Sequence, residues 1–132
     1  MKVHFYISEF HEKVELTILP ESFIKNKTNE QLLEKSIEKW QFIVDHMKEH
    51  SKIVGPNDNG CVTCACCMKY FWKDDCKGCP IYEFTGWRHC EFTPYGEYLT
   101  NRTIQNARKE LNFLKKVKIF SRKRRIEHDY RR

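Results

Sequence analysis

The chain has 132 residues, of which 40% are hydrophobic and 32% charged, and its formal net charge is +6. This length favours one hydrophobic core and leaves little room for a second domain, while nine Phe, six Tyr and three Trp exclude a disordered composition. Apolar runs are only a few residues long, and the first residues lack the length and cleavage site of a signal peptide, so we expect a soluble cytoplasmic protein with no membrane partner.

Alternating residues at the start of the chain predict a β-hairpin. Apolar and polar residues alternate from Val3 to Ile7, and the alternation resumes from Val14 to Ile18 before Pro20. A period of two residues is typical of strands. Because a two-stranded hairpin is only marginally stable by itself, we expect it to pack against the next element.

Two segments with helical periodicity flank the middle of the chain. In the first, apolar residues recur every three or four positions from Leu33 to Met47, and Thr28 with Gln31 matches a capping box at its start. The second is predicted over about residues 101–118. We expect one face of each helix to form the core together with the hairpin, through Ile37, Trp40, Val44, Leu111, Leu114, Val14, Leu16 and Ile18.

All seven cysteines lie between positions 61 and 90. This clustering favours a metal site over a disulfide framework, which would connect distant segments. Two CxxC pairs, Cys64/Cys67 and Cys76/Cys79, can each chelate one metal from a tight turn, and together they are typical of a four-cysteine structural zinc site. Metal binding would supply folding free energy to a segment that has no sustained helical or strand period.

The surplus cysteines leave the ligand set open. Cys90 or His89 could replace one of the four ligands, while Cys66 is expected to point away from the metal. Cys61 extends the first pair to CxxCxxC, and Cys79 precedes a proline, as in bacterial iron–sulfur motifs. An iron–sulfur cluster is therefore the alternative cofactor, and buried or redox-active thiols without metal are a third interpretation.

The middle of the chain resembles a family of small uncharacterised cysteine-rich proteins of bacteriophages and prophages. The resemblance covers about residues 34–114 and is carried by a helix with Trp40, a Gly-rich turn, Cys64-Ala-Cys66-Cys67, Cys76-Lys-Gly-Cys79-Pro80-Ile81, Thr85-Gly86, Cys90 and Thr93-Pro94-Tyr95. It implies a viral origin, the cytoplasm of the host cell as location, and metal ligation by Cys64, Cys67, Cys76, Cys79 and Cys90. It implies no particular activity.

Basic residues are concentrated at the end of the chain. Residues 115–132 contain nine Lys or Arg and two acidic residues, a net charge of +7, so the remainder is almost neutral. Such a segment, interleaved with aromatic residues, favours contacts with phosphates, although a solvated tail has the same composition. The predicted nucleic-acid-binding residues are Lys115, Lys116, Lys118, Arg122, Lys123, Arg124, Arg125, Arg131 and Arg132.

Catalysis is the less favoured class of function. The HxE and PCxxC signature of zinc deaminases is absent, and His89 with Glu91 is too common a pair to indicate a nuclease. The sequence therefore predicts one α+β domain over residues 1–120, with a zinc-binding segment at 61–90 and a basic tail at 121–132. It predicts a viral accessory protein that binds nucleic acid, or alternatively one that binds a host polymerase or defence protein.

Overall fold

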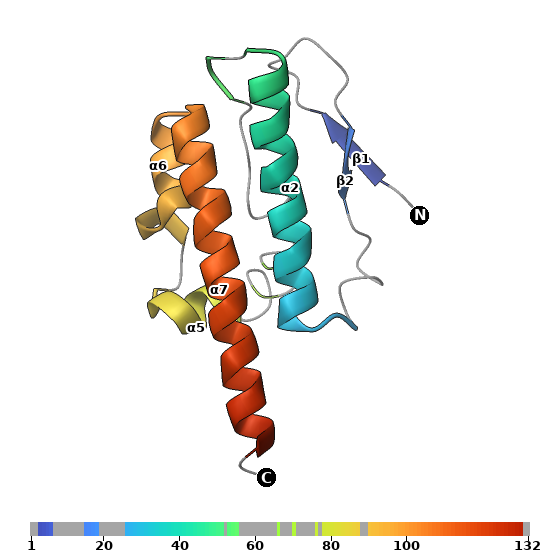
Figure 1. Cartoon of the computed structure of the whole chain (residues 1–132), viewed down its shortest axis with the longest axis vertical. Coiled ribbons are helices and arrows are strands. Elements are labelled where there is room, and N and C mark those ends of the chain that lie inside the picture. The colour runs from blue at the N-terminus through green and yellow to red at the C-terminus, as the bar shows by residue number, and fades with distance from the viewer. Residues whose placement is uncertain are drawn as a thin grey trace.

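Two long helices form the largest part of the fold. The computed structural model describes residues 3–6, 15–18, 26–51, 53–55, 66, 70, 76, 78–87 and 90–130. Helix α2 (Asn29–Glu49) and helix α7 (Ile104–Tyr130) pack along each other in opposite directions (Figure 1). Two short helices, α5 (Pro80–Thr85) and α6 (Pro94–Thr100), pack against α7, and the 3-10 helix η2 (Cys90–Phe92) leads into α6.

The α+β class predicted from the sequence is wrong, because the protein belongs to the all-α class. Two short strands, β1 (Val3–Tyr6) and β2 (Glu15–Ile18), pair antiparallel with Val3 opposite Ile18. Helices nevertheless make up most of the described residues, and the described core is built from helices and the segments that join them. Amphipathic helices can bury their apolar faces against one another, so this core needs no sheet to cover it.

The predicted start of the first long helix is confirmed. Thr28 is the N-cap of α2: its Oγ1 accepts a hydrogen bond from the Gln31 N–H (3.2 Å), and its own N–H donates to Gln31 Oε1 (2.9 Å). This reciprocal pair gives hydrogen-bond acceptors to two backbone N–H groups that the start of a helix would otherwise leave without partners. The capping box therefore fixes where α2 begins.

The core lies between α2, α6 and α7. Of the predicted core residues, Trp40, Val44, Leu111 and Leu114 are buried, and Ile37 is partly buried against them. Trp40 packs edge-on against two tyrosines of α6, Tyr98 with ring centroids 4.8 Å apart and Tyr95 at 6.0 Å. The predicted contributions of Val14, Leu16 and Ile18 lie outside the described residues or side chains.

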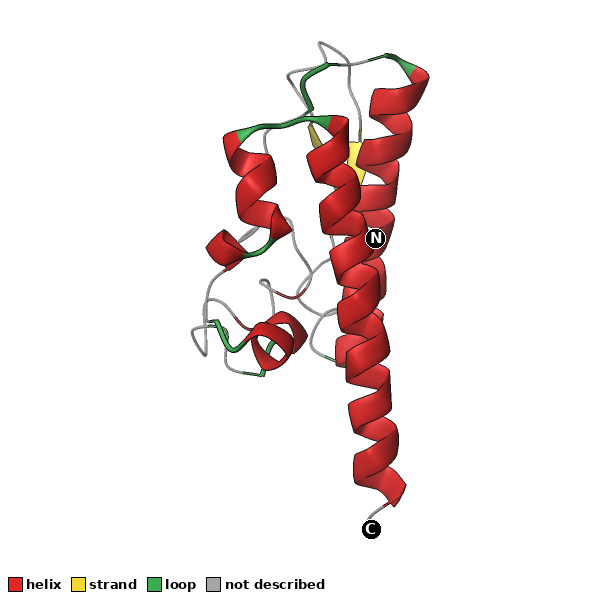
Figure 2. Cartoon of the chain, turned by 60° about the vertical axis from the view of Figure 1, so that its left-hand side comes forward, coloured by secondary structure: helices red, strands yellow, loops and turns green. Residues whose placement is uncertain are grey.

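Helix α7 is longer than the periodicity of its apolar residues predicts. It continues without a break through residue 120 to Tyr130, so the basic segment expected as a separate tail is helical. Its last turns extend past the start of α2 (Figure 1, Figure 2). The apolar pattern ends earlier because, among the described side chains, Val117 is the last residue of α7 that lies in the buried core. Continuation of the helix places the basic residues at fixed positions around one axis.

Candidate metal-binding turn and basic helix face

Cys76 and Cys79 lie on one tight turn directly before α5. The Cys79 N–H donates to the Cys76 carbonyl oxygen (3.0 Å), which closes the turn. Cys76 and Gly78 both have a positive φ, 69° and 86°, and such a conformation is uncommon for a residue that has a Cβ. Both thiol side chains are buried. The turn therefore presents two sulfur donors at the spacing from which a CxxC pair chelates one metal.

A small polar network fixes this turn to the first turn of α2. The Tyr70 hydroxyl donates to Asn29 Oδ1 (2.6 Å), and Asn29 Nδ2 donates to the Gly78 carbonyl oxygen (3.1 Å). The Cys76 N–H in turn donates to the Tyr70 carbonyl oxygen (3.0 Å). Because Asn29 is the first residue of a capped helix, the position of the two thiols depends on the start of α2.

Replacing Gly78 with alanine should destabilise the protein by about 1–3 kcal/mol. A Cβ at this position would lie 2.9 Å from Tyr70 Cε1 and would force a side chain into a backbone conformation with φ +86°. The matched control is Gly86→Ala, because Gly86 has φ +78° but nothing within 4 Å of the added Cβ. Urea unfolding of both variants would separate backbone strain from the clash with Tyr70; equal losses would show that Tyr70 moves aside without cost.

The remaining predicted ligands are not assembled with this turn in the described structure. Cys90 begins η2, where its carbonyl oxygen accepts hydrogen bonds from Thr93 Oγ1 (2.6 Å) and the Thr93 N–H (3.1 Å). Cys64 and Cys67 lie outside the described residues. Among the residues whose placement is described, no three His, Cys, Asp or Glu side chains are positioned to share a metal ion.

Cys66, which the sequence analysis expects to point away from the metal, lies in the core. It is fully buried and belongs to the hydrophobic core together with Cys76 and Cys79. A thiol in such surroundings behaves as a small apolar side chain. Replacing Cys66 with serine would bury a hydroxyl group, so the substitution should destabilise the protein.

The cations of α7 divide into two sets according to the direction in which they point. Three exposed pairs recur every seven residues, a spacing of two helical turns or roughly 10 Å. We call them the outer basic face: Arg108, Lys109, Lys115, Lys116, Arg122 and Lys123. Between residues 104 and 126 the sequence contains one acidic residue, Glu110, and its side chain is buried on the other side of α7. Within residues 104–126, therefore, no carboxylate of α7 lies beside the outer basic face, although Lys109 contacts Glu97 of α6.

The other three predicted nucleic-acid-binding cations, which we call the inner cations, are paired with carboxylates of the body. Lys118 Nζ lies 2.7 Å from Glu34 Oε1, Arg125 Nε lies 2.7 Å from Glu30 Oε1, and Arg124 Nη1 lies 3.5 Å from Glu83 Oε2. These pairs join the second half of α7 to α2 and α5. Their charge is largely neutralised within the chain, whereas Arg131 and Arg132 lie outside the described residues.

A groove lies between the first turn of α2, α5 and the end of α7. It encloses about 330 Å³ and is lined by Thr28, Asn29, Glu30, Glu83, Ser121, Arg124 and Arg125. A capped helix start with two arginines could attract an anion. Here each arginine already faces a glutamate, so the groove is better suited to holding α7 in place than to binding phosphate.

Replacing Glu34 with glutamine should remove a small pH dependence of stability. The hydrogen bond and positive charge of Lys118 hold the pKa of Glu34 below its ordinary value of 4.5. A lowered pKa in the folded state means that the pair stabilises the protein above pH 4.5, and that this contribution is lost as the pH falls through the folded pKa.

The effect should be small because both side chains are partly exposed to solvent. Thermal unfolding near neutral pH and well below pH 4.5 would measure it, with Glu49→Gln as a control that removes an exposed glutamate elsewhere on α2. Identical acid sensitivity of wild type and Glu34→Gln would exclude a role for the pair.

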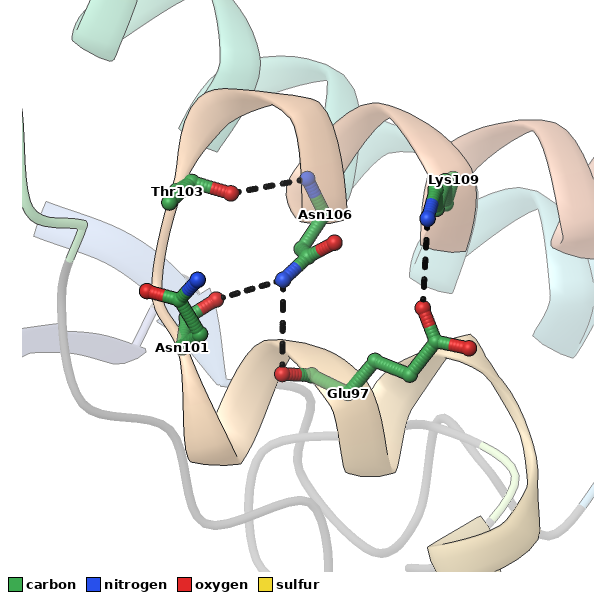
Figure 3. Close-up of polar contacts among 5 residues, drawn as sticks. All are labelled: Glu97, Asn101, Thr103, Asn106 and Lys109. Atoms are coloured by element: carbon green, nitrogen blue, oxygen red, sulfur yellow. Dashed lines mark hydrogen bonds and ion pairs between the residues drawn. The ribbon is translucent and has the colours of Figure 1, made fainter.

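The junction between α6 and α7 sets the rotation of α7 about its axis (Figure 3). Thr103 caps α7 by accepting the Asn106 N–H (3.2 Å), and Asn106 Nδ2 donates to the Asn101 carbonyl oxygen (2.8 Å). Lys109 Nζ contacts Glu97 Oε2 of α6 at 3.4 Å. These contacts determine which residues of α7 face the body and which form the outer basic face.

Arg108 and Lys109 were missed by the sequence analysis, which began the basic region at Lys115. The signal that could have found them is the recurrence of two adjacent basic residues at 108/109, 115/116 and 122/123. Helices α5 and α6 were missed as well. Each has a proline at its first position, and α5 ends at Gly86 in the left-handed conformation, which are recognisable signals of helix start and end.

No known protein family matches this chain, and no curated protein or solved structure is significantly similar to it. The resemblance to cysteine-rich phage proteins stays a prediction. None of the helices in the described part of the chain has the length and apolar character needed to span a membrane.

Proposed function

We propose that this protein binds nucleic acid through the outer basic face of α7. The observation that supports the proposal is the arrangement of six exposed cations in three pairs along one side of a rigid helix. Because the helix already fixes the backbone positions of these cations, no backbone ordering is needed when their side chains contact a row of phosphates, and every contact releases counterions. The inner cations, which pair with Glu30, Glu34 and Glu83, serve to hold that helix against the body.

The spacing of the outer pairs suits a nucleic-acid backbone. Pairs roughly 10 Å apart can each reach a different phosphate of one strand. Contacts of this kind position a protein but carry no base information. Weak sequence preference is therefore part of the proposal.

Salt dependence of binding tests the proposal directly. Fluorescence anisotropy with labelled single-stranded and duplex oligonucleotides should show binding at low salt, and the logarithm of the affinity should fall with the logarithm of the salt concentration. The slope should be roughly −0.7 to −0.9 per phosphate contact. Absence of binding at low salt, or an affinity insensitive to salt, would exclude this function.

A structural zinc ion is the second element of the proposal. The residues that fit it are Cys76 and Cys79, two buried thiols on one closed turn, with further donors from Cys64, Cys67 or Cys90. A metal bound to four thiolates would stabilise the segment between the long helices and leave no position open for catalysis. Its role would be to hold the body on which α7 packs.

Metal analysis of protein purified without oxygen should find about one zinc per chain. Cys76→Ser should abolish that zinc and lower the thermal stability, because loss of a structural ligand is transmitted to folding. Stoichiometric iron and sulfide would instead identify a cluster, and metal-free protein of full stability would show that the buried thiols are core residues.

Binding to a host protein is the second candidate function. It is favoured by Trp87 and Phe92, which are 50% and 72% exposed and have ring centroids 5.6 Å apart. Exposed aromatic residues are enriched at protein interfaces. If the protein is of viral origin, capture of a host protein that survives high salt and is lost in Trp87→Ala would favour this alternative over nucleic-acid binding.

A further inference from the structure

The outer basic face is bordered by a cluster of three phenylalanines. Phe113 and Phe120 of α7 both meet Phe84 of α5, with ring centroids 5.7 and 5.2 Å apart and the rings strongly tilted to each other. Phe84 is 38% exposed and Phe120 is 36% exposed, while Phe113 is partly buried beneath them. Helix α5 therefore adds a ring to the surface of α7 instead of covering it.

Cations and aromatic rings alternate along this side of α7. The order Lys109, Phe113, Lys116, Phe120, Lys123 follows steps of four, three, four and three residues. Residues three and four apart on a helix are neighbours on its surface, so each ring lies between two lysines. Lys116 and Lys123 are exposed on either side of Phe120.

We infer that the outer basic face binds single-stranded nucleic acid, with bases stacking on Phe84 and Phe120 while Lys116 and Lys123 contact the adjoining phosphates. This inference rests on the proposed function and narrows it to a class of ligand. Alternation of stacking rings with backbone contacts is the general way in which proteins hold single strands without reading their sequence. The bases of a duplex cannot stack on the rings, because they are already stacked on one another and paired.

The charges around the three phenylalanines favour a nucleic acid over a hydrophobic peptide as the ligand of this cluster. The exposed groups that flank the rings along α7 are lysines, and Arg124 on the far side is paired with Glu83. A hydrophobic peptide would gain from the three rings but not from the flanking lysines. An unpaired nucleotide supplies both an aromatic face and a negative charge, so it matches both parts of the surface.

The test uses the full chain and three labelled probes of equal length: oligothymidine, an abasic single strand and a mixed-sequence duplex. Phe84→Leu with Phe120→Leu keeps apolar volume but removes the aromatic faces. This double variant should lose about tenfold in affinity for oligothymidine and change by less than about twofold for the abasic strand and the duplex. Phe42→Leu on α2, a residue with the same 36% exposure as Phe120, should change none of the three affinities.

Circular dichroism and thermal unfolding would establish that the variants are folded. If the double variant does not fold, the single Phe120→Leu variant replaces it in the binding measurements. An unchanged affinity for oligothymidine would overturn the stacking inference while leaving phosphate binding intact. A similar loss on all three probes would also overturn it, because the rings would then act through the position of α7. Failure of the wild-type protein to bind any probe at low salt would reject the proposed function itself.

Discussion

Neutralising three outer cations should weaken nucleic-acid binding far more than neutralising three inner cations. The outer variant, Lys116→Gln with Arg122→Gln and Lys123→Gln, removes exposed charges that make no ion pair among the described residues. If each contacts a phosphate, the salt slope should become shallower by about two to three, and the affinity at low salt should fall by at least about a hundredfold.

The matched control is Lys118→Gln with Arg124→Gln and Arg125→Gln. It removes the same charge from the same helix, but from residues that already lie beside Glu34, Glu83 and Glu30. Its salt slope should change by less than about one. Measurement of anisotropy over a series of salt concentrations would compare the two variants. Equal losses in both would mean that the total charge of the chain, and not the outer basic face, governs binding.

Replacing Trp40 with alanine should lower the free energy of unfolding by about 3–5 kcal/mol. Trp40 is 3% exposed and joins α2 to α6 through edge-on contacts with Tyr95 and Tyr98. The surrounding helices cannot collapse fully into the space that the indole leaves, so the cost includes a cavity as well as the lost burial. This is a large part of the stability of a domain of this size.

Trp87→Ala is the matched control, because Trp87 is 50% exposed and lies outside the core. Its substitution should cost less than about 1 kcal/mol. Urea unfolding followed by circular dichroism would measure both without depending on tryptophan fluorescence. A small loss for Trp40→Ala would contradict the packing of α6 against α2 through this residue.

The sequence predicted α2 well, but it missed the last turns of α7 and the class of the fold. The apolar residues of α2 and their capping box depend on contacts three and four positions apart, so local spacing was enough to place the helix and its start. The fold class, by contrast, depends on which elements cover the apolar face of α2. The sequence suggested the hairpin together with Leu111 and Leu114 of α7, whereas the described core also contains Tyr98 of α6, a helix that was not predicted.

A metal site was predicted from spacing alone, and the described structure gives the geometry of the turn that carries two of its predicted ligands. The CxxC pattern identified Cys76 and Cys79, and the structure shows the closed turn and its attachment to Asn29. The sequence could not reveal that attachment, because Asn29 and Gly78 are 49 positions apart. It also could not show that Cys66, which was left out of the predicted ligands, is fully buried in the core.

By itself, the sequence determined where charge, cysteine and helical periodicity are concentrated, because each of these is a property of neighbouring residues. Only the tertiary structure decided which cations are available to a partner. Packing of α7 against α2 and α5 turns Lys118, Arg124 and Arg125 toward glutamates of the body, and it leaves Lys116 and Lys123 facing solvent beside Phe120. The physical reason is that a helix has one rotation about its axis, and burial of Leu111, Leu114 and Val117, together with the contacts at the junction with α6, fixes that rotation for every residue of α7.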